Sequence, residues 1–125
     1  LYVIVRPGPH INAEMTWFGY PQWLLRMPEI QAKTPLGTSV VYPYVTGAFP
    51  IPSYASSKLY EETRHYFKSF AEILKKHCYP KGGIIAIQAD NETCNFFRDQ
   101  PYIMDYSEES VQQDFWKKNI RKLRS

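Results

Sequence analysis

Polar side chains that could act on a substrate stand at the end of an apolar run, in the stretch IIAIQADNE of residues 84–92. Asp90 and Glu92 flank Asn91 there, and another acid, Glu14, follows an apolar run near the start of the chain. Two carboxylates that face one cleft are typical of glycoside hydrolysis, in which one carboxylic acid protonates the leaving-group oxygen. Whether Glu14 and Glu92 can face each other depends on the elements that carry them.

Structural roles are also open to these residues. Asp90 or Asn91 could cap the turn that follows the apolar run. Glu92 could be a solvated loop acid, as most glutamates are, and Glu14 could form an ion pair with a nearby arginine. His10, which follows a proline, is more often a turn residue than a base. The residue types alone therefore leave catalytic and structural readings open.

The elements around these residues indicate an α/β fold. Strands are expected at 1–5 and 84–88, where the runs 1–5 and 84–87 are apolar without alternation, as is typical of strands in a parallel sheet covered by helices. The segment Arg6–Pro9 is expected to stop the first strand, because proline lacks a donor. An amphipathic helix is expected from Ser56 or Ser57 to about His77. Two parallel strands make no stable sheet alone, so further strands are expected outside this sequence.

Shorter elements are expected in the remaining segments. The stretch PQWLL at 21–25 predicts a single helical turn, and residues 26–55, rich in proline and aromatics, predict a long, ordered but irregular loop. Ser107 is expected to cap a second helix. The apolar stripe of that helix comprises Val111, Phe115, Trp116, Ile120 and Leu123.

Polar residues follow both predicted strands, which suggests one shared site. In parallel α/β proteins the chemistry gathers at the carboxyl ends of the strands. His10, Asn12 and Glu14 follow the first strand, and the acids and amides around Glu92 follow the second. Neighbouring strands lie about 4.8 Å apart. We therefore expect Glu14 and Glu92 to approach one pocket.

Composition excludes several other classes of function. A formal net charge of +3 on 125 residues is small, and its one basic cluster, at 117–124, is typical of a solvated helix face, so no nucleic-acid partner is indicated. No apolar run is long enough for a transmembrane helix. No metal-ligand spacing or phosphate-binding glycine loop is present, so no metal or cofactor is predicted. Cys78 and Cys94 flank the second strand and are expected to be free thiols.

Two blocks of the sequence resemble glycoside hydrolase family 35. RPGPHINAE at 6–14, followed by FGYPQWLL at 18–25, is similar to the family's first motif, and GGIIAIQADNE at 82–92 is similar to its second. The later stretch YSEESVQQDFWKK at 106–118 is similar to a helix of family 42 β-galactosidases. The blocks stand in the family's order, and the likeness covers residues 1–92 well.

The resemblance implies a retaining β-galactosidase-like enzyme of the clan A barrels. Residues 1–125 would then be a fragment of the (β/α)8 catalytic domain, carrying barrel strands three and four with their loops and helices. Glu92 matches the general acid/base, whereas the nucleophile would lie beyond Ser125. Glu14 then becomes a sugar-binding acid and not half of the catalytic pair. The residues implied in substrate binding are His10, Asn12, Ala13, Glu14 and Asn91. Asn91 matches the residue that contacts the sugar 2-hydroxyl.

Departures from the family pattern keep rival readings open. His10 stands where the family usually has tyrosine, Met15 replaces a tryptophan, and Asp90 replaces a glutamate. The alternatives are a noncatalytic carbohydrate-binding or inactive remnant, and another clan A exo-glycosidase. The partner expected in each case is a carbohydrate, and the isolated fragment is expected to be inactive.

Three further expectations concern the barrel and the loop. Arg6 and Gln88 are expected to pack the barrel rather than to bind substrate. The loop from Met27 to Tyr54 is expected to shape the leaving-group side. Four aromatic residues could stack on a sugar or belong to the core: Trp17, Tyr42, Tyr44 and Phe49.

Overall fold

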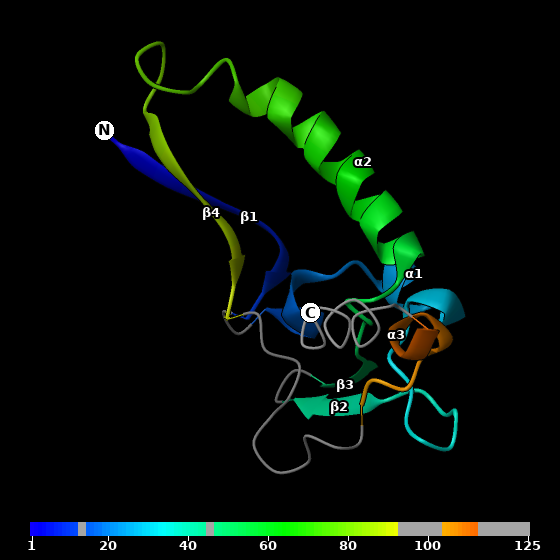
Figure 1. The fold of residues 1–125 in the computed structure, drawn as a ribbon. Helices are drawn as coiled ribbons and strands as arrows, with labels where there is room; N and C mark the ends of the chain where they lie inside the picture. The colour runs from blue at the N-terminus through cyan, green and yellow to red at the C-terminus, as the bar shows by residue number, and fades with distance from the viewer. Residues whose placement is uncertain (13–14, 45–46, 93–103, 113–125) are drawn as a thin grey trace, which may run out of the picture.

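The computed structural model describes residues 1–12, 15–44, 47–92 and 104–112 (Figure 1). Its strands are β1 (Val3–Ile11), β2 (Val41–Tyr44), β3 (Gly47–Pro50) and β4 (Ile84–Asn91). Its α-helices are α1 (Gln22–Leu25), α2 (Ser57–Leu74) and α3 (Glu108–Gln112), and two short 3-10 helices cover Thr16–Gly19 and Pro28–Ile30. Parallel strands and helices in this order agree with the α/β class that the sequence predicts.

Strands β1 and β4 pair in parallel, from Val3 opposite Ile84 to Ile11 opposite Asn91. The expectation that the chain leaves the strand at Arg6–Pro9 is wrong, because β1 continues to Ile11. Its register shifts on both sides of Gly8, which has a φ of +87°. The hydrogen bonds between strands are interrupted at such register shifts. A proline, which has no N–H to donate, can therefore be accommodated within the strand. The carboxyl ends of both strands consequently lie side by side.

Helix α2 lies between the two strands in the chain and contacts β1 through a hydrogen bond near Pro7. Its start is capped as predicted, since the Leu59 amide donates to Ser56 Oγ at 3.2 Å. Ser56 Oγ in turn donates to the carbonyl of Glu29 at 2.9 Å. Further along, the Tyr66 hydroxyl donates to the carbonyl of Pro7 at 2.7 Å. The helix ends at Leu74, one turn before the predicted His77, and these contacts tie it to the segment before it and to the strand.

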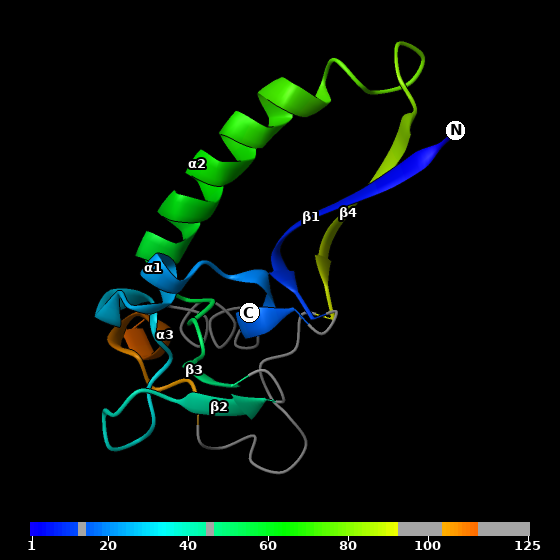
Figure 2. The ribbon, with the colours of Figure 1, turned by 180° about the vertical axis from the view of Figure 1, so that it is seen from behind.

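The stretch between β1 and α2 is more regular than its proline content predicts. The single turn α1 is confirmed, but β2 and β3 form an antiparallel pair inside the segment expected to be irregular. Figures 1 and 2 both show this pair beyond the carboxyl ends of β1 and β4. A buried cluster joins α1, β3 and α2, and its members are Phe18, Tyr20, Leu24, Leu25, Ile30, Phe49 and Leu59. This cluster holds the β2–β3 pair against α1 and the start of α2.

Apolar side chains of the strand pair are exposed where a larger sheet would bury them. Ile4 is 64% exposed, and Ile85 and Ile87 are each 54% exposed. Buried parallel strands normally have both faces covered.

Among the described residues, no helix is both long and apolar enough to cross a membrane. Cys78 is a free thiol, as predicted, whereas Cys94 and the apolar stripe after Gln112 lie outside the described residues.

Candidate active site

The ends of β1 and β4 bring Asn12 and Glu92 into direct contact. Asn12 Nδ2 donates to Glu92 Oε2 at 3.2 Å. The backbone N–H of Asn12 donates to the backbone carbonyl of Asn91 at 3.4 Å. Glu92 is exposed, so its carboxyl group is open to a molecule that approaches the strand ends. The neighbouring donor holds one carboxylate oxygen and leaves the group accessible. This arrangement agrees with the predicted meeting of polar groups from two strands.

Arg6 of β1 connects the same two strands through two hydrogen bonds to side chains of β4. Its Nε donates to Gln88 Oε1 at 3.1 Å, and its Nη1 donates to Asn91 Oδ1 at 2.6 Å. Asn91 is only 8% exposed. A short bond from a guanidinium to a buried amide is a charge-assisted hydrogen bond, which is stronger than a neutral one. Arg6 therefore connects β1 to β4 through hydrogen bonds, in addition to the packing role that is predicted from the sequence.

The backbone around Glu92 adopts an unusual conformation. Asp90 has a φ of 56° and Glu92 has a φ of 51°, in the left-handed region that side chains other than glycine rarely enter. Each such residue costs about 1–2 kcal/mol. Asp90 Oδ1 accepts a hydrogen bond from the His10 amide at 3.0 Å, which helps to hold this shape. Strained conformations of this kind cluster at ligand-binding and catalytic sites.

His10 lies under the strand ends with no exposed surface. Its ring packs on Phe18 and Tyr20, with centroids 4.9 Å and 5.7 Å away, and its Nδ1 lies 3.3 Å from the Tyr54 hydroxyl. Burial lowers the pKa of His10, although the charges of nearby acids oppose the shift. The ring is therefore neutral near pH 7. Its predicted part in substrate binding stays a prediction, because the ring does not reach the surface in this structure.

Two tyrosines beside His10 were not singled out as site residues from the sequence. Burial raises the pKa of the Tyr20 phenol, and nearby Tyr54 and Asp90 raise it further. Tyr20 is 2% exposed, whereas Tyr54 is 38% exposed. In the sequence, Tyr20 lies within the block FGYPQWLL, and Tyr54 lies within the segment rich in proline and aromatics before the predicted helix. Tyr54 thus connects buried His10 to the surface at the strand ends.

Replacing His10 with Gln is expected to make the protein less sensitive to acid. The unfolded chain takes up a proton at His10 as the pH falls through about 6.5, whereas the buried ring resists it because its pKa is lowered. The wild-type free energy of unfolding should therefore fall as the pH drops below about 6.5, and His10→Gln should lose part of that slope. Melting temperatures of the full-length protein between pH 5 and 8 measure this.

A matched control for that experiment is His65→Gln, since His65 is an exposed histidine on α2. It should keep the pH dependence of the wild type. Equal slopes for the wild type and His10→Gln would show that burial of His10 does not carry the acid sensitivity.

Several predicted residues lie elsewhere. Ala13 and Glu14 lie outside the described residues, as does the side chain of Tyr44. Phe49 is 3% exposed and belongs to the core cluster, and Trp17 and Tyr42 pack against that cluster. The structure therefore supports the core alternative for these three aromatics and not stacking on a sugar. In the described part of the chain, His, Cys, Asp and Glu form no group of three or more suited to a metal.

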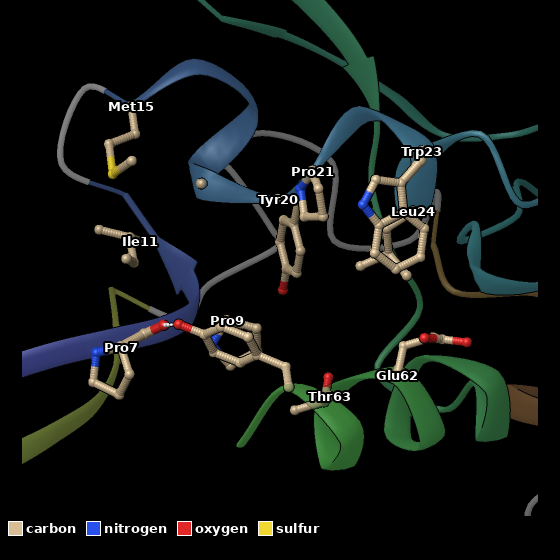
Figure 3. Close-up of a pocket in the computed structure, with 12 residues that line it drawn as sticks. Pro7, Pro9, Ile11, Met15, Tyr20, Pro21, Trp23, Leu24, Glu62 and Thr63 are labelled. Carbon is tan, nitrogen blue, oxygen red and sulfur yellow. Dashed lines mark hydrogen bonds between the residues drawn. The ribbon is translucent and has the colours of Figure 1, made fainter. Parts of the chain in front are cut away.

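A cavity of about 320 Å³ lies on the other face of β1, between this strand, α1 and α2 (Figure 3). Pro7, Pro9 and Ile11 line it, and they alternate along β1 with Arg6, His10 and Asn12. Figure 3 shows the Tyr20 hydroxyl directed into the cavity and the hydrogen bond on the carbonyl of Pro7. Its lining is mostly apolar. The cavity is therefore part of the layer between strand and helix, and Tyr20, whose ring packs on His10, both lines it and contacts the polar residues at the strand ends.

Comparison with known proteins agrees with the resemblance seen in the motifs. The sequence profile described as glycosyl hydrolases family 35 matches residues 1–42. An "Exo-beta-D-glucosaminidase" of Pyrococcus horikoshii is 37% identical over 122 residues, which is 91% of this chain. "Beta-galactosidase-1-like protein 3" of Rattus norvegicus is 30% identical over 89% of the chain, and "Beta-galactosidase-1-like protein 2" of Homo sapiens is 32% identical over 82%.

The aligned region is a small part of each relative. The chain spans 14% of the Pyrococcus and Rattus proteins and 13% of the human protein. No solved structure matches the chain significantly. These likenesses extend past the profile match and include the segment that carries Glu92.

Proposed function

Because the chain belongs to glycosyl hydrolase family 35, we propose that it forms part of the catalytic domain of an enzyme that hydrolyses O-glycosidic bonds in carbohydrates. The observation that carries the proposal is the position of Glu92. Its exposed carboxylate lies at the joined carboxyl ends of two parallel strands and is held by Asn12 at 3.2 Å. In parallel α/β proteins this edge is where substrates bind.

In this proposal β1 and β4 are the third and fourth strands of a (β/α)8 barrel. Three observations support it: the two strands are parallel, α2 connects them, and their apolar side chains Ile4, Ile85 and Ile87 are exposed. Adjacent barrel strands and outer helices would cover those side chains. The relatives are about seven times longer than this chain, which leaves room for the rest of a barrel.

Glu92 acts as the general acid and then as the general base of a retaining reaction. It protonates the glycosidic oxygen of the leaving group, and later removes a proton from the water that attacks the glycosyl-enzyme. The nucleophile is a second carboxylate, about 5–5.5 Å away, contributed from outside these 125 residues. His10, Asn12, Ala13, Glu14 and Asn91 bind the hydroxyl groups of the sugar. The loop that contains β2 and β3 borders the leaving-group side.

The preferred substrate is a β-galactoside, and the second candidate is a β-glucosaminide. Several relatives are named as β-galactosidase-like, which favours the first. Two relatives that are 37% and 35% identical are named "Exo-beta-D-glucosaminidase", which favours the second. His10 and Met15, which depart from the pattern of the galactosidases, are compatible with a changed sugar site.

The test is to assay the full-length protein on 4-nitrophenyl β-glycosides of galactose, glucose, glucosamine and xylose. We expect turnover of the galactoside, and proton NMR should detect the β-anomer as the first product. A kcat/KM that is higher for the glucosaminide than for the galactoside would make the β-glucosaminide the preferred substrate and leave the proposed mechanism unchanged. An α-anomer as the first product would exclude retention. If no glycoside is cleaved but calorimetry detects sugar binding, the chain belongs to a noncatalytic carbohydrate-binding protein.

A further inference from the structure

Arg6 holds the amide of Asn91 in one of its two possible orientations. A guanidinium has only donors, so the Asn91 atom 2.6 Å from Arg6 Nη1 must be the carbonyl oxygen Oδ1. A flipped amide would place its NH2 group against the cation and lose the hydrogen bond. Because Asn91 is 8% exposed, little water is available to replace that bond.

The nitrogen of the same amide, Asn91 Nδ2, is then a donor that does not face Arg6. Within the part of the chain that the structure describes, no protein group accepts a hydrogen bond from Asn91 Nδ2. The next residue is Glu92, and the backbone carbonyl of Asn91 meets the amide of Asn12 at 3.4 Å. Asn91 Nδ2 is thus a donor of fixed orientation on the residue that directly precedes Glu92, whose carboxylate is proposed to act on the substrate.

Gln88 completes the arrangement from below. Its Oε1 accepts from Arg6 Nε at 3.1 Å, so two different nitrogens of one guanidinium contact two acceptors of β4. The planar fork of arginine can do this with one fixed geometry, whereas the ammonium of lysine is a single flexible point charge. The contacts therefore require an arginine and not only a positive charge.

From these contacts we infer that Arg6 is a positioning residue for the reaction: it orients Asn91 so that Nδ2 donates to a substrate hydroxyl while Glu92 transfers the proton. Arg6 itself does not touch the substrate. The inference rests on the proposed function, because it assumes a sugar bound beside Glu92. It adds a role for a residue that the sequence assigns to packing.

The experiment measures kcat/KM of the full-length enzyme on its best aryl glycoside for a set of variants. Arg6→Met keeps much of the side chain's apolar volume and removes both hydrogen bonds, and Arg6→Lys keeps the charge but loses the fork. Each is expected to lower kcat/KM roughly tenfold to hundredfold, since small misplacements at an active site have effects of that size. Arg26→Met, a loss of an exposed arginine at the end of α1, is the matched control and should change kcat/KM less than twofold.

A double-mutant cycle with Asn91→Ala separates positioning from a general loss of structure. If Arg6 acts through Asn91, the double variant should be no less active than Asn91→Ala alone, within about twofold. Independent effects that multiply would overturn the inference, as would full activity of Arg6→Met or Arg6→Lys. If Arg6→Met does not fold, the melting temperature reveals it, and the same cycle with Arg6→Lys decides.

The result is distinguishable from a failure of the proposed function. Loss of activity in Glu92→Gln together with unchanged activity in both Arg6 variants overturns only the positioning role. Full activity of Glu92→Gln overturns the proposed role of Glu92, on which the positioning role depends.

Discussion

Replacing Glu92 with Gln should lower kcat/KM for an aryl β-glycoside with a poor leaving group by about a thousandfold, within the range of 10²–10⁴ typical of general acid–base catalysis. Glutamine keeps the size and the accepting oxygen that Asn12 Nδ2 contacts at 3.2 Å, so the local geometry should survive. It cannot give a proton to the glycosidic oxygen or take one from water. The loss therefore measures proton transfer and not a change in folding.

The dependence on the leaving group identifies the step that fails. A dinitrophenyl glycoside needs little protonation, so its glycosylation step should be almost unaffected in Glu92→Gln, while hydrolysis of the glycosyl-enzyme stays slow. Added azide needs no general base and should restore turnover by forming a glycosyl azide.

Glu72→Gln is the matched control for this prediction. Glu72 is an exposed acid on α2 that pairs with Lys75, and its loss should leave kcat/KM unchanged because surface ion pairs contribute little. Retained activity in Glu92→Gln on the poor leaving group, with no response to azide, would remove Glu92 from the mechanism. Such a result would favour a sugar-binding or inactive protein.

Much of the site could be predicted from the sequence, because parallel strands place their carboxyl ends together. Two non-alternating apolar runs, an amphipathic helix between them and polar residues after each run suffice for that inference. The capped start of α2 at Ser56 followed from local rules as well. The contact of Asn12 with Glu92 realises this part of the prediction.

The remainder depended on tertiary structure that local rules do not encode. Proline at positions 7 and 9 was expected to end β1, but the register shifts around Gly8 let the strand continue to Ile11. The pairing of β2 with β3 was hidden by the prolines at 43 and 50, which lie within the paired strands. The two hydrogen bonds of the Arg6 guanidinium could not be predicted either, because their acceptors lie more than 80 residues away along the chain.

Asp105 is another residue whose role only the structure reveals. Its Oδ1 accepts from the amides of Lys33 at 3.1 Å and Ser107 at 2.8 Å. Its Oδ2 accepts from Ser107 Oγ at 3.0 Å and from the hydroxyl of Ser53, which is 1% exposed. The Tyr106 amide adds a bond to the carbonyl of Lys33 at 2.9 Å. One carboxylate thus attaches the segment that begins α3 to two points of the loop between β1 and α2.

Replacing Asp105 with Ala should destabilise this attachment by about 3 kcal/mol. Hydrogen bonds to a charged acceptor contribute about 1.5–3 kcal/mol each, and a buried donor left without a partner costs about 1–3 kcal/mol. Water can replace some of the lost acceptors because Asp105 is only half-buried, so the sum over four donors is an upper bound. The buried hydroxyl of Ser53 and the Lys33 amide account for most of the expected loss.

Hydrogen exchange of the full-length protein measures that loss locally. The amides of Lys33 and Ser107 should exchange about a hundredfold faster in Asp105→Ala, because about 3 kcal/mol corresponds to roughly two orders of magnitude in the opening equilibrium. Glu108→Ala is the matched control, since Glu108 is exposed and its Oε1 accepts a hydrogen bond from Gln112 Nε2 on the surface at 2.7 Å. Unchanged protection of both amides in Asp105→Ala would mean that other contacts hold the segment. Faster exchange there without a change in kcat would separate the attachment from catalysis.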